Sequence, residues 1–270
     1  MADGYETRIE ALLAALRALP GAVVAFSGGV DSAALVFACR LALGERVLAV
    51  TAVSASLPDE ELAEARAFCA AHGLRHELVR TRELARAEYR RNAPDRCFHC
   101  KDELFVTLAA ALAGRPEAGW PVLYGAIADD LAEHRPGGAA ARAHGVRAPL
   151  AEAGLSKADV RRFSRSHGLG TAEKPAFACL ASRVPYGTPV DAALLARLAA
   201  AEAVLRNLGY RQFRVRHHDT VARVELLPED LPRALAERHA IQAGIAKAGY
   251  TYVALDLLGY RAGAMNEVLP

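Results

Sequence analysis

Two segments of the sequence carry residue types that suit chemistry on phosphate and carboxyl groups. "AFSGGVDS" (residues 25–32) joins glycines, serines and an aspartate, and "KPAFACLASRVPYG" (174–187) has Cys179 four residues before Arg183. Glycines let the backbone approach an anion, and amides at a helix N-terminus bind phosphate oxygens. A thiol on an irregular loop near a cationic side chain is typical of a nucleophile. The sequence therefore indicates phosphate binding and thiol chemistry in one chain, with a buried structural cysteine as the alternative for Cys179.

The first segment follows an apolar run and precedes a helical pattern, so we expect its glycines at a strand–turn–helix junction. Asp31 would repel a phosphate unless a divalent cation lies between them, which predicts Mg²⁺. The lysine of a Walker A loop is absent at the required spacing. An ordinary glycine turn with Asp31 or Ser32 as the helix N-cap is the alternative. The predicted phosphate-binding residues are Ser27, Gly28, Gly29, Asp31 and Ser32.

The five cysteines fall into two groups. Cys39 and Cys69 lie in predicted helices and are expected to be small buried residues. Cys97 and Cys100 form a C-x-x-C pair in "RCFHCK", which can chelate a metal, although tetrahedral zinc needs two further ligands. The remaining candidates are Cys179 and His99, and three thiolates suit an iron–sulfur cluster with one open iron. A redox-active or incidental pair is the alternative.

The order of apolar and helical segments predicts an α/β fold with a parallel sheet covered by helices. Ligands in such sheets bind at the carboxyl ends of the strands, where "SGGVDS" and "GAIADD" fall. After Tyr186 a long helix, two alternating strands and a further helix and strand predict a smaller α+β part. We expect domains at 1–186 and 187–270. The predicted strands are 21–26, 46–53, 74–80, 121–127, 211–219, 221–227 and 250–258, and the predicted helices include 58–72, 191–208 and 229–248.

Composition excludes several classes of protein. A net charge of +2 gives no broad basic field for nucleic acid, and no apolar run is long enough to cross a bilayer. The N-terminal segment has acidic residues before its apolar stretch and predicts an amphipathic helix rather than a secretory signal. We therefore expect a cytoplasmic protein without nucleic-acid or membrane partners. The apolar side of that helix is predicted to hold Leu12, Leu13, Leu16 and Leu19.

"SGGVDS" in this context resembles the PP-loop of the ATP pyrophosphatases, which include NAD and GMP synthetases and tRNA thiolation enzymes. The resemblance implies cleavage of ATP between its α- and β-phosphates and adenylation of a substrate oxygen. "YGAIADDL" is similar to the family's second nucleotide-site element, which includes Gly125 and in which Asp129 or Asp130 would hold Mg²⁺ or substrate. Lys174 resembles the family's phosphate-contacting lysine. Thr51, expected just past the second strand, is a candidate contact of adenine or ribose.

Six segments in order make the whole chain resemble the LarE family of ATP-dependent sulfur insertases. They are "SGGVDS", "RCFHCK", "YGAIADDLAEHRPG", "KPAFACLASRVPYG", "RVRHHDTVARVE" and "GYRAGAMNE". The resemblance implies conversion of the carboxylates of pyridinium-3,5-biscarboxylic acid mononucleotide to thiocarboxylates, for the nickel-pincer cofactor of lactate racemase. It also implies a homo-oligomer.

Two chemistries occur in that family. In the sacrificial form, the cysteine matching Cys179 attacks the adenylate and then loses its sulfur, leaving dehydroalanine. In the other form, three cysteines hold a 4Fe–4S cluster that delivers an extra sulfide. The presence of Cys97, Cys100 and Cys179 together favours the cluster form. Arg183 is predicted to activate the thiolate, and Glu202 to act near it.

The strand "RQFRVRHHD" adds a predicted anion site. Side chains alternate along a strand, so Arg214, Arg216 and His218 share one face. With Arg223 of the neighbouring strand they are expected to bind the substrate phosphate through charge-assisted hydrogen bonds, and Glu225 to orient one of the arginines. A solvated face with cross-strand ion pairs is the alternative.

Three other functions compete with this interpretation. A tRNA thiolase would need a basic RNA-binding surface or an added RNA domain, which the near-neutral charge disfavours. A non-catalytic ATP-binding sensor would have no use for Cys179 beside Arg183. An ammonia-using synthetase is disfavoured because no glutaminase domain is evident.

Overall fold

The computed structural model describes residues 4–132, 136–175, 178–261 and 263–267, so short parts of three sequence motifs (133–135, 176–177 and 262) lie outside the described residues. The chain divides into two compact units, which are described separately. Unit 1 comprises Met1–Ser54, Asp59–Glu83 and Pro94–Ala176, and unit 2 comprises Ala55–Pro58, Leu84–Ala93 and Phe177–Pro270. The predicted domain boundary at residue 186 stays a prediction.

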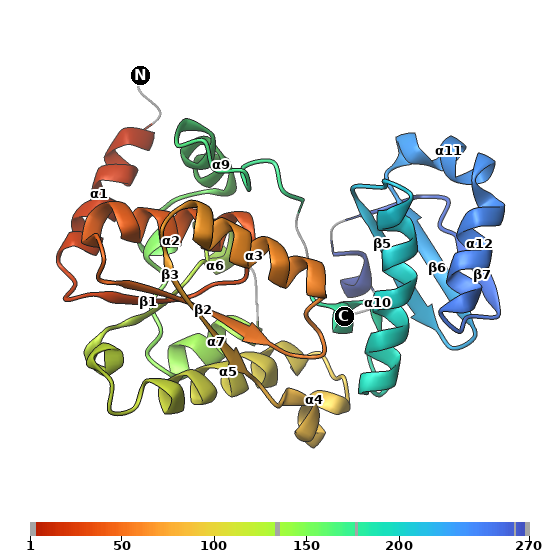
Figure 1. The fold of residues 1–270 in the computed structure, drawn as a ribbon, viewed down its shortest axis with the longest axis horizontal. Helices are drawn as coiled ribbons and strands as arrows, with labels where there is room; N and C mark the ends of the chain where they lie inside the picture. The colour runs from red at the N-terminus through yellow and green to blue at the C-terminus, as the bar shows by residue number, and fades with distance from the viewer. Residues whose placement is uncertain (1–3, 133–135, 176–177, 262, 268–270) are drawn as a thin grey trace. The chain divides into compact units, whose positions relative to one another are not determined.

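Unit 1 is built on a four-stranded sheet of order β3-β2-β1-β4, in which every strand pair is parallel (Figure 1). The two inner strands, β1 and β2, are rich in valine and alanine, as is typical of strands that are buried on both faces. This arrangement confirms the predicted α/β fold with a parallel sheet. The strands are β1 (Ala22–Ala25), β2 (Val47–Val53), β3 (Arg75–Arg80) and β4 (Val122–Tyr124).

Helices cover both faces of this sheet, and the alternation of side chains along β1 shows how. Val24 points into a core that includes residues of α1, α2, α3 and α9, whereas Val23 packs with Leu108 of α5 on the opposite face. Figure 1 shows these two helical layers on either side of the strands. The helices are α1 (Tyr5–Arg17), α2 (Val30–Leu43), α3 (Asp59–Ala71), α5 (Arg96–Leu112), α6 (Ala128–Ala132), α7 (Pro136–Ala143), α8 (Pro149–Glu152) and α9 (Lys157–Ser166), with a 3₁₀ turn at Pro116–Gly119.

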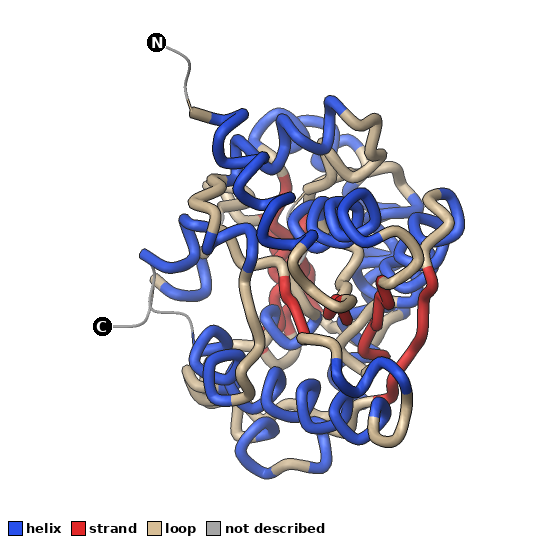
Figure 2. The backbone as a smooth tube through the Cα atoms, turned by 90° about the vertical axis from the view of Figure 1, so that its left-hand side faces the viewer, coloured by secondary structure: helices blue, strands red, loops and turns tan. Residues whose placement is uncertain are grey.

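Unit 2 contains a three-stranded sheet of order β5-β6-β7, and helices pack against it; Figure 2 draws strands in red and helices in blue. β5 (Phe213–His218) and β6 (Val221–Leu226) are antiparallel and joined by a tight turn, where Asp219 has a φ of 51°. Aspartate tolerates this left-handed conformation better than most residues. β7 (Tyr252–Leu255) is parallel to β6. The helices are α4 (Ala87–Arg90), α10 (Ala192–Asn207), α11 (Leu231–Ala236) and α12 (Arg238–Lys247). The 3₁₀ turns include η3 (Leu180–Arg183), η4 (Pro228–Asp230) and η5 (Ala264–Asn266). A further 3₁₀ turn, η1 (Glu83–Ala85), begins at Glu83, the last residue of a unit 1 segment.

The prediction of one helix over residues 229–248 was wrong, because the structure divides it. The turn η4 leads into α11, and α12 begins only after Glu237. Pro232 has no N–H to donate and fits the first turn of a helix, so a new helix starts there. The Glu237 carboxylate at the second break accepts hydrogen bonds from Tyr210 Oη at 2.9 Å and Arg233 Nε at 3.0 Å.

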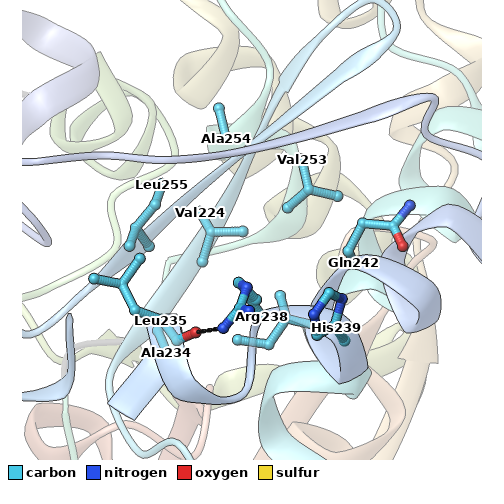
Figure 3. A pocket seen from close by; sticks show the side chains of 10 residues that line it. Val224, Ala234, Leu235, Arg238, His239, Gln242, Val253, Ala254 and Leu255 are labelled. Carbon is cyan, nitrogen blue, oxygen red and sulfur yellow. Dashed lines mark hydrogen bonds between the residues drawn. The ribbon is translucent and has the colours of Figure 1, made fainter. Parts of the chain in front are cut away.

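An apolar cavity of about 350 Å³ lies in unit 2 between the sheet and the last two helices (Figure 3). Val224 of β6 lines it together with Leu235 of α11 and Ile241 of α12. Arg223 and Glu225 alternate with Val224 along β6, so their side chains leave the opposite face of the sheet. None of the predicted site residues lines this cavity. Among the described residues, no helix is long and apolar enough to cross a membrane.

Candidate functional site

The predicted phosphate loop of unit 1 is an ordered turn between β1 and α2. Ser32 Oγ donates to the carbonyl of Gly29 at 3.1 Å, and the Ser27 amide donates to Ser32 Oγ at 3.3 Å. The two serine hydroxyls are 3.1 Å apart. These contacts fold the loop over the N-terminus of α2, where backbone amides and the helix dipole favour an anion.

Two glycines allow close backbone approaches at this loop. Gly28 has a φ of 73°, and a Cβ there would lie 3.2 Å from the Cβ of Ala65 in α3. A Cβ at Gly125, the residue after β4, would lie 2.8 Å from the amide nitrogen of Ser32. Since a side chain at Gly125 would collide with backbone, the predicted second nucleotide element packs directly on the first turn of α2.

Asp31 and Asp129, the predicted Mg²⁺ ligands, both contact Lys157 at the start of α9. Lys157 Nζ donates to Asp31 Oδ1 at 2.8 Å and to Oδ2 at 2.7 Å, while the Lys157 amide donates to Asp129 Oδ2 at 2.8 Å. Asp130 instead accepts the Ile127 amide at 3.1 Å within its own turn. Mg²⁺ is usually held by one or two carboxylates together with substrate phosphates. Two carboxylates that contact the same residue, one through its ammonium group and one through its backbone amide, fit such a site.

Lys157 is a residue that sequence reasoning missed. The signal that could have found it is the capping box of α9, in which Ser156 Oγ accepts the Asp159 amide and Asp159 accepts the Ser156 amide. This box fixes the first turn of α9 and with it the backbone amide and side chain of Lys157. The lysine carries the positive charge that balances Asp31 in the structure.

Lys174, the predicted phosphate contact, is held by three acceptors. Its Nζ donates to the Gly28 carbonyl at 3.1 Å, to Glu61 Oε2 at 2.8 Å and to Glu64 Oε2 at 2.7 Å. Burial lowers the pKa of Lys174, but the hydrogen bonds with Glu61 and Glu64 outweigh burial and hold the pKa above its usual value. Lys174 is therefore a cation that bridges the phosphate loop and α3.

Thr51 lies inside β2, so the expectation that it lies just past the second strand was wrong. Its side chain is buried, and its hydroxyl donates to the Phe26 carbonyl at 2.8 Å. His76 Nε2 lies 2.8 Å from the same oxygen. Since a hydroxyl has one proton, the histidine nitrogen is the donor in the second bond. Both contacts are with residues of the segments on either side of β2, and a role for Thr51 toward adenine or ribose stays a prediction.

The four cysteines of unit 1 differ in exposure. Cys39 and Cys69 are buried, and burial raises the pKa of each thiol to about 12. Cys97 is exposed and Cys100 partly exposed, one turn apart near the start of α5. Within the described ranges, no group of three or more His, Cys, Asp or Glu residues is arranged to hold a metal ion. The C-x-x-C pair can supply two thiolates, and the predicted cluster stays a prediction.

Cys179 belongs to unit 2 and directly precedes η3. Its carbonyl oxygen accepts hydrogen bonds from Ser182 Oγ at 2.8 Å, the Ser182 amide at 3.0 Å and Arg183 Nη1 at 3.0 Å. The Leu180 amide donates to the Ser56 carbonyl at 3.0 Å. These bonds fix the backbone on both sides of the thiol, which is itself partly exposed.

Arg183 and Glu202, two predicted catalytic residues, form a buried ion pair beneath this turn. Arg183 Nε donates to Glu202 Oε1 at 2.8 Å and Nη2 donates to Oε2 at 3.0 Å, with 0% and 1% of the side chains exposed. Arg183 Nη1 also donates to the Ala178 carbonyl, and Glu202 accepts the Val215 amide at 3.1 Å. In these contacts Arg183 acts as a positioning residue for the Cys179 backbone.

A second ion pair joins the sheet of unit 2 to the same turn. Arg216 binds Glu225 through two hydrogen bonds of 2.9 Å and 2.8 Å, and its Nη1 donates to the Ser182 carbonyl at 2.9 Å. Arg223, directly opposite Arg216 in the sheet, contacts Glu225 at 3.1 Å and Asp256 at 3.3 Å. The structure thus brings together Arg216, Arg223 and Glu225, and adds Asp256, which the sequence did not indicate.

Arg214 lies on the same face of the sheet and has a different environment. Its side chain is buried and lies 5.0 Å from the ring centroid of Tyr260. Burial, followed by repulsion from Arg183, lowers the pKa of Arg214 to about 10. A guanidinium whose charge is destabilised in this way would be stabilised by an anion. His218, at the end of β5, is exposed.

Comparisons with known proteins agree with these features. A family model described as NAD synthase matches residues 6–104, which include the phosphate loop. A Lactiplantibacillus plantarum protein named pyridinium-3,5-bisthiocarboxylic acid mononucleotide synthase is 34% identical over 264 residues, covering 97% of this chain and 95% of that protein. An uncharacterised Synechocystis protein is 42% identical over 98% of both chains. One from Methanocaldococcus jannaschii is 24% identical over 241 residues, 89% of this chain and 90% of that protein. The chain therefore belongs to the family of pyridinium-3,5-bisthiocarboxylic acid mononucleotide synthase, the LarE family that its motifs resemble.

Proposed function

We propose that this protein is an enzyme that uses ATP and Mg²⁺ to convert the carboxylates of a pyridinium mononucleotide to thiocarboxylates. The observation that carries the proposal is the arrangement of unit 2, where a partly exposed thiol, Cys179, lies on a backbone fixed by Arg183 and Ser182. The relative from Lactiplantibacillus plantarum is named for a product of this class, a bisthiocarboxylic acid mononucleotide.

The first step is adenylation, for which unit 1 supplies the residues. A substrate carboxylate oxygen attacks the α-phosphorus of ATP, and the bond to the β-phosphate oxygen breaks, so that pyrophosphate leaves. The loop amides and the hydroxyls of Ser27 and Ser32 bind phosphate oxygens at the start of α2. Asp31 and Asp129 would hold Mg²⁺, which would neutralise charge on the phosphates. The contact of Lys157 with Asp31 would be lost when the carboxylate binds the metal.

The second step transfers sulfur to the acyl-adenylate. In the sacrificial form, the Cys179 thiolate attacks the acyl carbon and AMP leaves with the bonding electron pair. Loss of the Cα proton and cleavage of the Cβ–S bond then release the thiocarboxylate and leave dehydroalanine. Arg183 and Ser182 hold the Cys179 carbonyl during both events. Each protein molecule would then supply one sulfur.

We favour the form in which Cys97, Cys100 and Cys179 hold a 4Fe–4S cluster. The support from the structure is that these three thiols are exposed or partly exposed, whereas Cys39 and Cys69 are buried. When bound, such a cluster supplies a sulfide for the transfer, so that the protein is not consumed. Thiolates in accessible positions are the ones suited to act as ligands.

The substrate phosphate is bound by the arginines of β5 and β6. Arg214 is the principal candidate, because its buried guanidinium lies on the same face of the sheet as Arg216 and Arg223. Arg216 and Arg223 are held in place by Glu225 and Asp256 and supply two further guanidinium groups. Guanidinium groups of this kind bind phosphate through paired hydrogen bonds.

Intact-protein mass spectrometry distinguishes the two forms of sulfur transfer. After anaerobic iron–sulfur reconstitution, the protein is incubated with ATP, Mg²⁺, sulfide and the pyridinium dicarboxylate mononucleotide. We expect Cys179 to stay intact while the amount of thiocarboxylate exceeds the amount of protein. A loss of one H₂S per protein, in proportion to product, would contradict the cluster form and support the sacrificial one. Absence of any thiocarboxylate would contradict the proposed function.

Replacement of Asp31 by asparagine tests the metal site. We expect Asp31→Asn to weaken binding of Mg²⁺-ATP by at least about tenfold, because the carboxylate that faces the metal is lost. Isothermal titration at several Mg²⁺ concentrations measures the effect. Asp59→Asn, an exposed carboxylate in the first turn of α3, is the control and should bind as the wild type does. Equal affinity of wild type and Asp31→Asn would exclude Asp31 as a ligand.

A further inference from the structure

The face of α3 that borders the phosphate loop has two carboxylates with no part in the proposed reaction. Glu61 and Glu64 are separated by three residues, so they lie on one side of the helix. Ala65 next to them is fully buried and packs close to Gly28. This helix face therefore lies directly against the loop in which the nucleotide phosphates are proposed to bind.

Both carboxylates bind the ammonium group of Lys174, and this group has no further proton to donate. An ammonium group has three donors. They are used by the Gly28 carbonyl at 3.1 Å, Glu61 at 2.8 Å and Glu64 at 2.7 Å. A phosphate oxygen can therefore accept a hydrogen bond from Lys174 only after one of these three acceptors has been displaced.

The three acceptors differ in how easily they can be displaced. The Glu64 side chain is 60% exposed, whereas the Glu61 side chain is 11% exposed. An exposed ion pair contributes little, because water and salt compete for both partners. A carboxylate that is largely buried loses far more when it is separated from its cation. Glu64 is thus the acceptor that a phosphate oxygen replaces at the lowest cost.

We propose that Glu64 is a competing anion that the nucleotide displaces from Lys174, while Glu61 is a positioning residue that keeps the ammonium group at the loop. This inference rests on the proposed use of ATP. It assigns opposite effects to two carboxylates in the same helix. Glu64 lowers nucleotide affinity by occupying the lysine, and Glu61 raises affinity by holding the lysine beside the Gly28 carbonyl.

The test compares Glu61→Gln and Glu64→Gln with the wild type by isothermal titration of Mg²⁺ and the α,β-methylene analogue of ATP. We expect Glu64→Gln to lower the Kd about two- to fivefold, the range that an exposed ion pair provides. This gain should shrink at high salt, which screens the exposed pair in the wild type. Glu61→Gln should raise the Kd about tenfold, because a buried charged partner is lost. Glu64→Asp, which keeps the charge, should be close to the wild type.

Three outcomes would overturn the inference. The first is a shift of both Gln variants in the same direction, which would indicate a general charge effect. The second is a Glu64→Gln gain that persists in a Lys174→Gln background, because the competition acts through that lysine. The third is no binding to the wild type, which contradicts the proposed use of ATP itself and is distinguishable from the other two. Since Glu64 is exposed, this part of the test remains decisive even where Glu61→Gln fails to fold.

Discussion

Replacement of Cys179 by alanine is expected to abolish thiocarboxylate formation while ATP-dependent pyrophosphate release remains measurable. The thiol belongs to unit 2, and the residues proposed for adenylation belong to unit 1. Both forms of sulfur transfer use Cys179, either as the sulfur donor or as a cluster ligand. Parallel assays of pyrophosphate and of thiocarboxylate on the same protein preparation measure the two steps separately.

Cys69→Ala provides the matched control, since it removes a thiol that is buried in α3 and has a pKa of about 12. We expect this variant to transfer sulfur and to lose a modest amount of stability, about 1 kcal/mol, from a small cavity. Wild-type sulfur transfer by Cys179→Ala would exclude the thiol from the reaction. Loss of both pyrophosphate release and thiocarboxylate formation would contradict the proposal that residues of unit 1 carry out adenylation and Cys179 of unit 2 acts only in sulfur transfer.

Replacement of Glu202 by glutamine is expected to lower the free energy of unfolding by about 3 kcal/mol, because it leaves the Arg183 charge buried without its carboxylate. Neither side chain has an exposed fraction above 1%, so solvent cannot replace the lost charge. The same carboxylate also accepts the Val215 amide. Urea unfolding followed by circular dichroism measures the change.

The exposed pair of Arg261 and Glu267 in the same unit serves as the comparison, with side chains 36% and 58% exposed. We expect Glu267→Gln to change the free energy of unfolding by less than about 0.5 kcal/mol. The double variant Arg183→Met with Glu202→Leu should recover much of the loss, because no buried charge remains. A Glu202→Gln variant as stable as Glu267→Gln would show that the buried pair contributes little.

The sheet of unit 1 was predictable because valine-rich runs alternate with helical segments, and this pattern permits few arrangements. The strand–turn–helix position of the predicted phosphate loop was predictable because its glycines and serines are consecutive in sequence and follow an apolar run. The broken helix was not, since alanine and leucine between residues 231 and 247 have high helix propensity and mask the interruption at Glu237.

The ion pairs of the candidate site could not be predicted from the sequence. Lys157 binds Asp31 across 126 positions, and Lys174 binds Glu61 across 113 positions, so neither pair leaves a local pattern. The contact between Arg216 and Glu225 could be predicted in part, because the alternation of side chains along neighbouring strands limits which arginines can face Glu225. The function of Arg183 in holding carbonyl oxygens was not indicated, since spacing shows which residues are near but not which atoms they contact.

Burial divides the five cysteines into two groups with different reactivity. Alkylation of the accessible group can therefore report whether these cysteines hold a cluster or lose a sulfur. Alkylating reagents react with thiolates, and a thiol with a pKa of about 12 is almost wholly protonated at neutral pH. Cys39 and Cys69 are therefore expected not to react with such a reagent in the folded protein. The number of alkyl groups incorporated then counts only Cys97, Cys100 and Cys179. Ligation of a cluster protects these thiols together, whereas sacrifice of one sulfur removes a single site permanently.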